Sequence, residues 1–292
     1  MRLRRTLPLL LLLAVGPGIS PVRSQLARGW NDPPAADEVD VDADTKLSNL
    51  LLKTPGIPAQ LEVCLDLVWN PREPDDRLKR AALRRLRSSD PRLLSDLIMT
   101  RSERIAPAQR APLVRLLASV YPRMGGVSSR VDEFFVDAIR STDPVLSEAG
   151  INAAVELGLR DGYLPMREIS MRADSPLRQK AIMGVAALKD PRAVDFFIRL
   201  LDANGAPRDD LYKALASLGR PAALFLKMKA LDPDPAERQR ALDGLLPMAA
   251  AEDLSTLYTF IQKYPPEGDL KTRVYDTIAQ LETSQPAAAG KP

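Results

Sequence analysis

Between residues 45 and 282, hydrophobic positions recur three and four residues apart, in segments of about ten to fifteen residues. Polar residues fill the positions between them, so each segment has one apolar face, as an amphipathic α-helix does. Three segments show this clearly: Leu78, Ala82 and Leu86; Val194, Phe197 and Leu201; and Leu254, Leu257 and Ile261. No stretch alternates convincingly with the period of two that a half-buried strand requires. The pattern predicts an all-α chain.

Prolines mark where these helices begin. The chain has 26 prolines among 292 residues, and several follow an aspartate at the start of an apolar segment. These pairs are Asp90-Pro91, Asp143-Pro144, Asp190-Pro191, Asp232-Pro233 and Asp234-Pro235. An aspartate accepts hydrogen bonds from the free amides of a first turn, and a proline at the first helical position loses nothing by lacking an N–H. Each pair therefore predicts the start of a helix.

The predicted helices recur at a nearly constant interval. The first helices of successive pairs open near Asp75, Ala108, Asp143, Asp174, Pro207, Asp234 and Asp269. Their mean spacing is about 32 residues, which is typical of stacked helical hairpins. One hairpin cannot bury its apolar face alone, so its neighbours must cover it. We expect an α-solenoid of about six hairpins over residues 45–282, with residues 45–69 and the final helix as caps.

The sequence of residues 174–202, DSPLRQKAIMGVAALKDPRAVDFFIRLLD, resembles a HEAT-like repeat of the bilin-lyase type. Asp174 and Asp190 stand at that family's two aspartate positions, and Arg178 stands at its arginine position. Three small residues stand where the family has a tight helix contact: Ala181, Ala186 and Ala187. The resemblance is good over residues 143–263 and implies an α-solenoid used for protein binding.

The resemblance does not extend to bilin attachment, because the chain has no histidine and its only cysteine lies outside the matching part. Tetratricopeptide repeats have a similar period of about 34 residues, but their spacing of Trp, Leu, Gly and Tyr is not met. Irregular hairpins and a helical bundle that is not a solenoid stay open as alternatives.

Residues 1–24 are arranged like a cleaved secretory signal peptide. Arginines precede an apolar run over residues 7–15, and small residues lie before a cleavage site near Ser24. This run is far shorter than the roughly 20 residues that span a bilayer. We therefore expect an exported protein, secreted or periplasmic, with no integral membrane span after cleavage.

Cleavage would also change the net charge. It removes four arginines and no acid, so 41 basic residues become 37 against 38 acidic ones, and +3 becomes about −1. Nucleic-acid binders need a persistent cationic surface, so we expect no nucleic-acid partner. Residues 25–44 carry acids and prolines without helical periodicity and are expected to form a flexible acidic arm. Residues 283–292 are expected to be a disordered tail.

The composition excludes several kinds of site. With no histidine and only Cys64, the chain lacks Ser-His-Asp and Cys-His nucleophilic sites, His-ligated metal sites and intramolecular disulfides. Asp40, Asp42 and Asp44 imitate the opening of a calcium loop, but Thr45 stands where that loop needs glycine. We expect no catalytic residue, no cofactor and no bound metal.

The second helix of each predicted pair is expected to line the concave face of the solenoid. On one such helix, Asp195 and Arg199 lie on a single polar stripe. Alignment of the next second helices places Phe225 at the position of Asp195, and Lys229 and then Thr259 at the position of Arg199. We predict that these five residues form a groove for another protein or peptide. An ordinary solvated face with intrahelical ion pairs is the alternative.

These observations predict an exported, non-catalytic scaffold or adaptor of the cell envelope that binds another protein. One alternative is a structural envelope component that contacts lipid or peptidoglycan. Another is an enzyme with paired carboxylates, although no pair is marked by the sequence. A basic cluster could meet an anionic surface, or the acids of residues 37–44 as an autoinhibitory arm, and a solvated helix face is again the simpler reading. The cluster consists of Lys79, Arg80, Arg84, Arg85 and Arg87.

Overall fold

The computed structural model describes residues 40–69, 74–125, 128–203 and 205–284. These residues form fifteen α-helices, α2 to α16, and six short 3-10 helices, and they contain no strand. The predicted all-α fold is thus confirmed. The expected signal peptide lies outside the described residues, as do residues 25–39 of the expected arm and residues 285–292 of the expected tail.

The helices with even numbers include the seven predicted first helices. They are α2 (Val41–Leu51), α4 (Asp76–Ser88), α6 (Ala111–Val120), α8 (Pro144–Leu157), α10 (Arg178–Ala187), α12 (Arg208–Leu218), α14 (Pro235–Leu245) and α16 (Gly268–Ser284). The odd helices are α3 (Ile57–Trp69), α5 (Pro91–Ser102), α7 (Ser129–Arg140), α9 (Tyr163–Met171), α11 (Arg192–Leu201), α13 (Ala223–Ala230) and α15 (Leu254–Lys263). The 3-10 helices are η1 (Pro107–Gln109), η2 (Tyr121–Met124), η3 (Arg160–Gly162), η4 (Arg220–Ala222), η5 (Leu246–Met248) and η6 (Ala251–Asp253).

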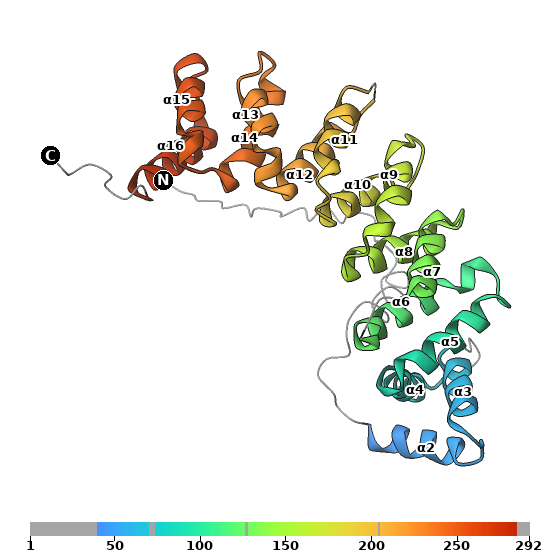
Figure 1. The fold of residues 1–292 in the computed structure, drawn as a ribbon. Helices are drawn as coiled ribbons and strands as arrows, with labels where there is room; N and C mark the ends of the chain where they lie inside the picture. Colours follow the sequence, from blue (N-terminus) through green and yellow to red (C-terminus); the bar gives the residue numbers. More distant parts are fainter. Residues whose placement is uncertain (1–39, 70–73, 126–127, 204, 285–292) are drawn as a thin grey trace, which may run out of the picture.

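The helices follow one another along an arc, with α4 to α16 of the even series on its inner side and the odd helices on its outer side (Figure 1). From α2 to α14, each even helix contacts the next even helix, whereas consecutive odd helices contact each other less. The most extensive contacts join an odd helix to the even helix after it, as in α7–α8 and α13–α14. The close pairs are therefore shifted by one helix from the predicted hairpins.

Small residues let the even helices approach closely. Gly184, Ala214 and Gly244 lie thirty residues apart on α10, α12 and α14, and all three are buried. A Cβ atom on Gly244 would lie 3.2 Å from the Ala216 Cβ atom of α12, and one on Gly184 would lie 3.3 Å from the Ile151 side chain of α8, so these contacts between even helices leave little room for a side chain. Closer spacing of the even helices than of the odd ones bends the row and places the even helices inside the arc.

Most predicted helix starts follow from local chemistry. The side chains of Asp75, Asp90, Asp143 and Asp234 accept hydrogen bonds from first-turn amides of α4, α5, α8 and α14. Asp174 does not act in this way, because α10 begins only at Arg178 and its N-cap is a leucine without a side-chain bond. Of the predicted small contact residues, Ala181 and Ala186 are buried but Ala187 is exposed.

Both ends of the folded region extend further than predicted. Residues 41–44, expected in the flexible arm, form the first turn of α2, because Asp40 accepts a hydrogen bond from the amide of Ala43 and caps the helix. Leu47 and Leu51 are then buried on the side of α2 that packs against the core. At the other end α16 continues to Ser284, so the first two residues of the expected tail are helical.

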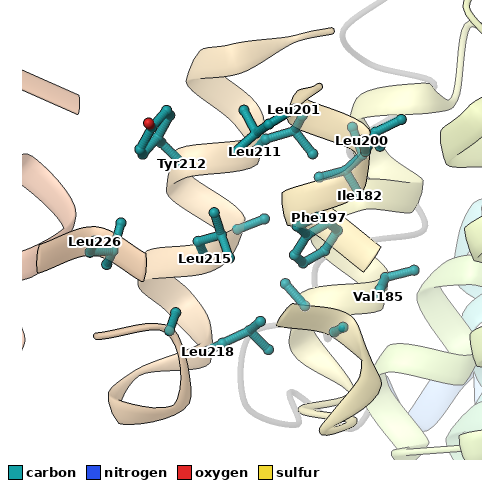
Figure 2. Close-up of a cluster of buried hydrophobic side chains, with 14 of the residues drawn as sticks. Ile182, Val185, Phe197, Leu200, Leu201, Leu211, Tyr212, Leu215, Leu218 and Leu226 are labelled. Atoms are coloured by element: carbon teal, nitrogen blue, oxygen red, sulfur yellow. The ribbon is translucent and has the colours of Figure 1, made fainter. Parts of the chain in front are cut away.

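The buried side chains form two clusters that meet at α7 and α8. The first extends from Ala43 to Ala153, and the second extends from Ile139 to Ile278. Figure 2 shows the middle of the second cluster, where Ile182, Phe197 and Leu215 from three successive helices lie close together. Each helix thus shares its apolar side chains with neighbours on both sides, and the core is continuous along the arc.

Candidate functional site

The five predicted partner-binding residues lie on the outer side of the arc. Asp195 and Arg199 belong to α11, Phe225 and Lys229 to α13, and Thr259 to α15, which are odd helices (Figure 1). Their expected position on the concave face is therefore wrong. The sequence alignment placed corresponding residues together, but the curvature of the row decided which series of helices is inside.

These residues also differ in how free their side chains are. The Phe225 ring packs 6.2 Å from the Tyr212 ring and is half-buried. The Lys229 ammonium is held 2.8 Å from an Asp232 carboxylate oxygen, and the Thr259 hydroxyl donates to a backbone carbonyl of its own helix. Asp195 and Arg199 are exposed. The predicted groove is thus not a set of free polar groups. The alignment that related its residues at intervals of thirty nevertheless agrees with the structure.

That alignment is visible in the burial of the odd helices. Four residues thirty positions apart at the starts of α9, α11, α13 and α15 are all buried: Tyr163, Ala193, Ala223 and Asp253. The same holds for Ser170, Leu200, Ala230 and Phe260. Residues related by thirty positions therefore occupy equivalent places on these four helices.

The same register reveals an apolar surface that the sequence analysis missed. Seven hydrophobic residues occupy two equivalent positions one helical turn apart, on the exposed or half-buried side of the odd helices. These outer rows are Leu164, Val194, Leu224 and Leu254, and Ile198, Met228 and Tyr258. Leu224 is 69% exposed, Met228 63% and Leu164 51%. The signal was present in the sequence as hydrophobic residues repeated at intervals of thirty.

A ladder of polar contacts joins the even helices of the inner side. Lys180 on α10 pairs with Glu148 on α8, and Gln179 donates to Asp210 on α12 over 2.8 Å. Arg240 on α14 lies 2.5 Å from Asp209, and the ladder continues through an ion pair of 2.8 Å between Asp243 and Arg273 on α16. From α8 to α16, each even helix is thus joined to the next one by a polar contact that includes an acid.

The family-like arginine position also has a structural role. Arg178 donates from Nε to the Ser170 carbonyl over 3.1 Å, and Arg238 donates to the Asp232 carbonyl over 2.9 Å. Arg208, thirty residues from each of them, reaches the Leu201 carbonyl at 3.4 Å. Each arginine therefore ties the first turn of an even helix to carbonyls at the end of the preceding odd helix.

Two buried carboxylates resemble catalytic groups only superficially. Asp253 is fully buried and lies 2.5 Å from Arg220 and 3.0 Å from Lys227. Burial raises the pKa of Asp253, but hydrogen bonds from Arg220, the Ala250 amide and Lys227 outweigh it and hold the pKa below its ordinary value. Such a carboxylate stays ionised and binds its cations, so it is a poor proton donor at neutral pH.

Glu237 is held in a similar way, 2.9 Å from Arg208 and 2.8 Å from the Tyr212 hydroxyl, which donates to it. Burial, followed by this hydrogen bond, raises the pKa of Tyr212 above its ordinary value. The Cys64 thiol is buried among apolar side chains, and this burial raises its pKa to about 11, so it is protonated at neutral pH and a weak nucleophile.

Two clefts open between successive odd helices. One of about 630 Å³ lies between α5 and α7 and contains Glu133, Asp137 and Arg130, and one of about 590 Å³ lies between α7 and α9. Both mix acids with arginines. In the described part of the chain, no three His, Cys, Asp or Glu side chains gather as a metal site would require, and no helix is long and apolar enough to cross a bilayer.

No family model matches this chain, and no curated protein matches its sequence. A functional assignment therefore depends on the arc and on the surfaces that its two series of helices present.

Proposed function

We propose that this chain is an α-solenoid of about six HEAT-like hairpins with a cap at each end, and that it serves as an exported, non-catalytic scaffold that holds another protein. The thirty-residue register of α9 to α15, the structural arginines and the continuous core support the repeat assignment. The arrangement of residues 1–24 supports export.

The outer rows are the observation that carries the binding function. Single exposed apolar residues are normal on a soluble protein, but these recur at equivalent positions on four successive odd helices, with Leu224 and Met228 more than three-fifths exposed. Packed helices lie about 10 Å apart, and the odd helices on the outer side of the arc are spaced more widely than the even ones, so the rows extend over at least about 30 Å. An amphipathic helix of about 20 residues in a partner would match that length.

A scaffold also fits the charged groups better than an enzyme does. The buried carboxylates of Asp253 and Glu237 face arginines, and both clefts are lined by arginines as well as acids. Acid–base catalysis needs carboxylates whose pKa values are moved toward neutrality, and the shift of Asp253 is in the opposite direction. A structural envelope component is the second candidate, because the outer rows could also contact lipid.

Site-specific photocrosslinking in the exporting cell tests the proposal. A photoreactive side chain at Leu224 or Met228 should give crosslinks to a discrete protein of the envelope, whereas one at Met183, which is 38% exposed on the inner side, should not. The double variant Leu224→Asp/Met228→Asp should lose the partner while keeping its helical circular dichroism. Crosslinks to lipid alone would favour the structural envelope component, and equal crosslinking from Met183 would contradict the assignment of the outer rows.

A further inference from the structure

Helix α4 carries a stripe of arginines that faces the inside of the arc. The stripe residues recur three and four positions apart, and they are Arg77, Arg80, Arg84 and Arg87. The buried side of α4 is formed by Leu78, Ala81, Ala82 and Leu86. Helix α4 contacts α3 behind it and α2 and α6 on its flanks, so its remaining surface is the inner one (Figure 1).

Two of these arginines already bind carboxylates. Arg77 lies 3.6 Å from Asp40, and Arg84 lies 2.8 Å from Asp44. The two aspartates are four residues apart in the cap and first turn of α2, so they project on one side of it. The N-terminal cap thus provides an internal example of how an acidic segment lies against this stripe.

The next arginines along the inner face have no such partner. Arg80 and Arg87 on α4 and Arg115 on α6 form no ion pair with any described residue. Helix α6 buries all its residues except Pro112, Arg115 and Ser119, and α4, α5, α7 and α8 surround its other sides. Arg115 therefore also faces the inside of the arc, beside the stripe.

The local charge is strongly positive although the chain as a whole is nearly neutral. Residues 75–130 contain thirteen Lys and Arg and only five Asp and Glu. From α8 onward the inner face pairs its own charges, as Glu148 and Lys180 do. This excess of positive charge attracts anionic partners to this part of the chain, and the arginine stripe of α4 together with Arg115 presents it to the inner face.

We infer that the inner face of α4 and α6 binds an acidic segment of a partner polypeptide. A guanidinium donates charge-assisted hydrogen bonds to a carboxylate, and Arg84 already donates one such bond from Nη2 to Asp44 over 2.8 Å. A flat membrane reaches a convex or planar surface more easily than the hollow side of an arc, which a polypeptide can enter. This surface is separate from the outer rows, so it does not depend on the function proposed for them.

A binding assay with the full mature chain tests the inference. Fluorescein-labelled decaglutamate should bind in low salt, and raising the salt above about 0.1 M should weaken it. The variant Arg80→Glu/Arg115→Glu should bind about tenfold more weakly, which corresponds to the loss of one or two charge-assisted contacts. The matched control Arg140→Glu/Arg172→Glu makes the same charge change at exposed positions of the odd series and should stay within about twofold of the parent.

Circular dichroism checks that both variants are folded, and the milder Arg80→Gln/Arg115→Gln variant should show an intermediate loss. An equal loss in the control variant would overturn the inference, because it would show attraction to net charge alone. Vesicles rich in phosphatidylglycerol and a short duplex DNA serve as competing probes. If the binding of the vesicles or of the DNA is weakened by Arg80→Glu/Arg115→Glu as much as the binding of decaglutamate is, the surface is not selective for acidic polypeptides and the inference fails.

Discussion

The two halves of the arc solve the same packing problem with different regularity. From α9 to α15, positions thirty residues apart share burial, and Arg178, Arg208 and Arg238 recur at that interval. From α2 to α8 no single interval holds, and other residues make the equivalent bonds, such as the Ser147 hydroxyl that donates to the Ile139 carbonyl. A constant interval lets each helix meet the same neighbours, so identical contacts can repeat.

The difference extends to the charges of the inner face. In the regular half each even helix offers an acid or a base that the next one matches, as Asp209 and Arg240 do. In the irregular half α2 and its N-cap pair with Asp75, Arg77 and Arg84, whereas Arg80 and Arg115 form no ion pair with a described residue. The regular half thus uses its inner charges internally, and the irregular half presents them to a partner.

The largest expected effect lies at the junction of the halves. A Cβ atom on Gly150 of α8 would lie 2.6 Å from the backbone nitrogen of Ile139 on α7. Gly150→Ala should therefore destabilise the chain by about 3 kcal/mol, because the main chains must separate. At Gly184 the nearest atom is the flexible Met166 sulfur, so Gly184→Ala should cost about 1 kcal/mol.

Urea unfolding followed with two probes measures both variants. The only tryptophans are Trp30 and Trp69, so fluorescence reports on the N-terminal half and circular dichroism on the whole chain. In Gly150→Ala, the urea midpoint measured by fluorescence should also differ from the one measured by circular dichroism, because the substitution uncouples the two cores that meet at α7 and α8. If Gly150→Ala costs no more than Gly184→Ala, the junction yields easily and the halves are not joined as rigidly as the contacts indicate.

A second, smaller effect is expected within the regular half. Asp253→Asn removes the charge between Arg220 and Lys227 and should cost about 2 kcal/mol at neutral pH. Because the pKa of Asp253 is lower in the folded chain than its ordinary value of 3.8, this stabilisation is complete above that value and is lost as the pH falls through the folded pKa. The difference between parent and variant should therefore shrink below about pH 4.

Thermal unfolding followed by circular dichroism from neutral to acidic pH measures this difference. The neighbouring Glu252→Gln changes an exposed partner of Arg220 and should cost no more than about 0.5 kcal/mol. A constant difference between parent and Asp253→Asn at all pH values would contradict the role of the ionised carboxylate.

The contrast between the halves also explains what the sequence could predict. Helix starts such as Asp143-Pro144 depend on a few adjacent residues, so their chemistry could be recognised directly. Asp174 belongs to the same pattern, but α10 starts later, at Arg178. The turn before it is closed by hydrogen bonds from the Ser175 and Arg178 amides to the Arg172 and Ser175 carbonyls, so the α-helix itself starts four residues after Asp174.

The functional surface was harder to predict because it depends on curvature. Whether Asp195 and Arg199 lie inside or outside the arc is decided by how closely the small residues of α10, α12 and α14 let the even helices approach. The outer rows were recognisable only after burial had fixed the interval at thirty. The first turn of α2, residues 41–44, was assigned to the arm because it has few apolar residues and α4 supplies most of the surface that stabilises this helix.

The smallest effect on stability is expected at the boundary between the two kinds of inner face. Glu148 and Lys180 are each 39% exposed, so Glu148→Lys should lower the free energy of unfolding by only about 0.5 kcal/mol. It should nevertheless strengthen decaglutamate binding about threefold at low salt, because it extends the basic face from α6 to α8 and leaves Lys180 unpaired. The double variant Glu148→Lys/Lys180→Glu restores an ion pair. Its free energy of unfolding and its affinity for decaglutamate should therefore return to those of the parent. If Glu148→Lys lowers the free energy of unfolding by more than about 1.5 kcal/mol, the ladder of polar contacts holds the arc together. If Glu148→Lys leaves decaglutamate binding unchanged, the charges of the ladder do not limit where an acidic partner lies.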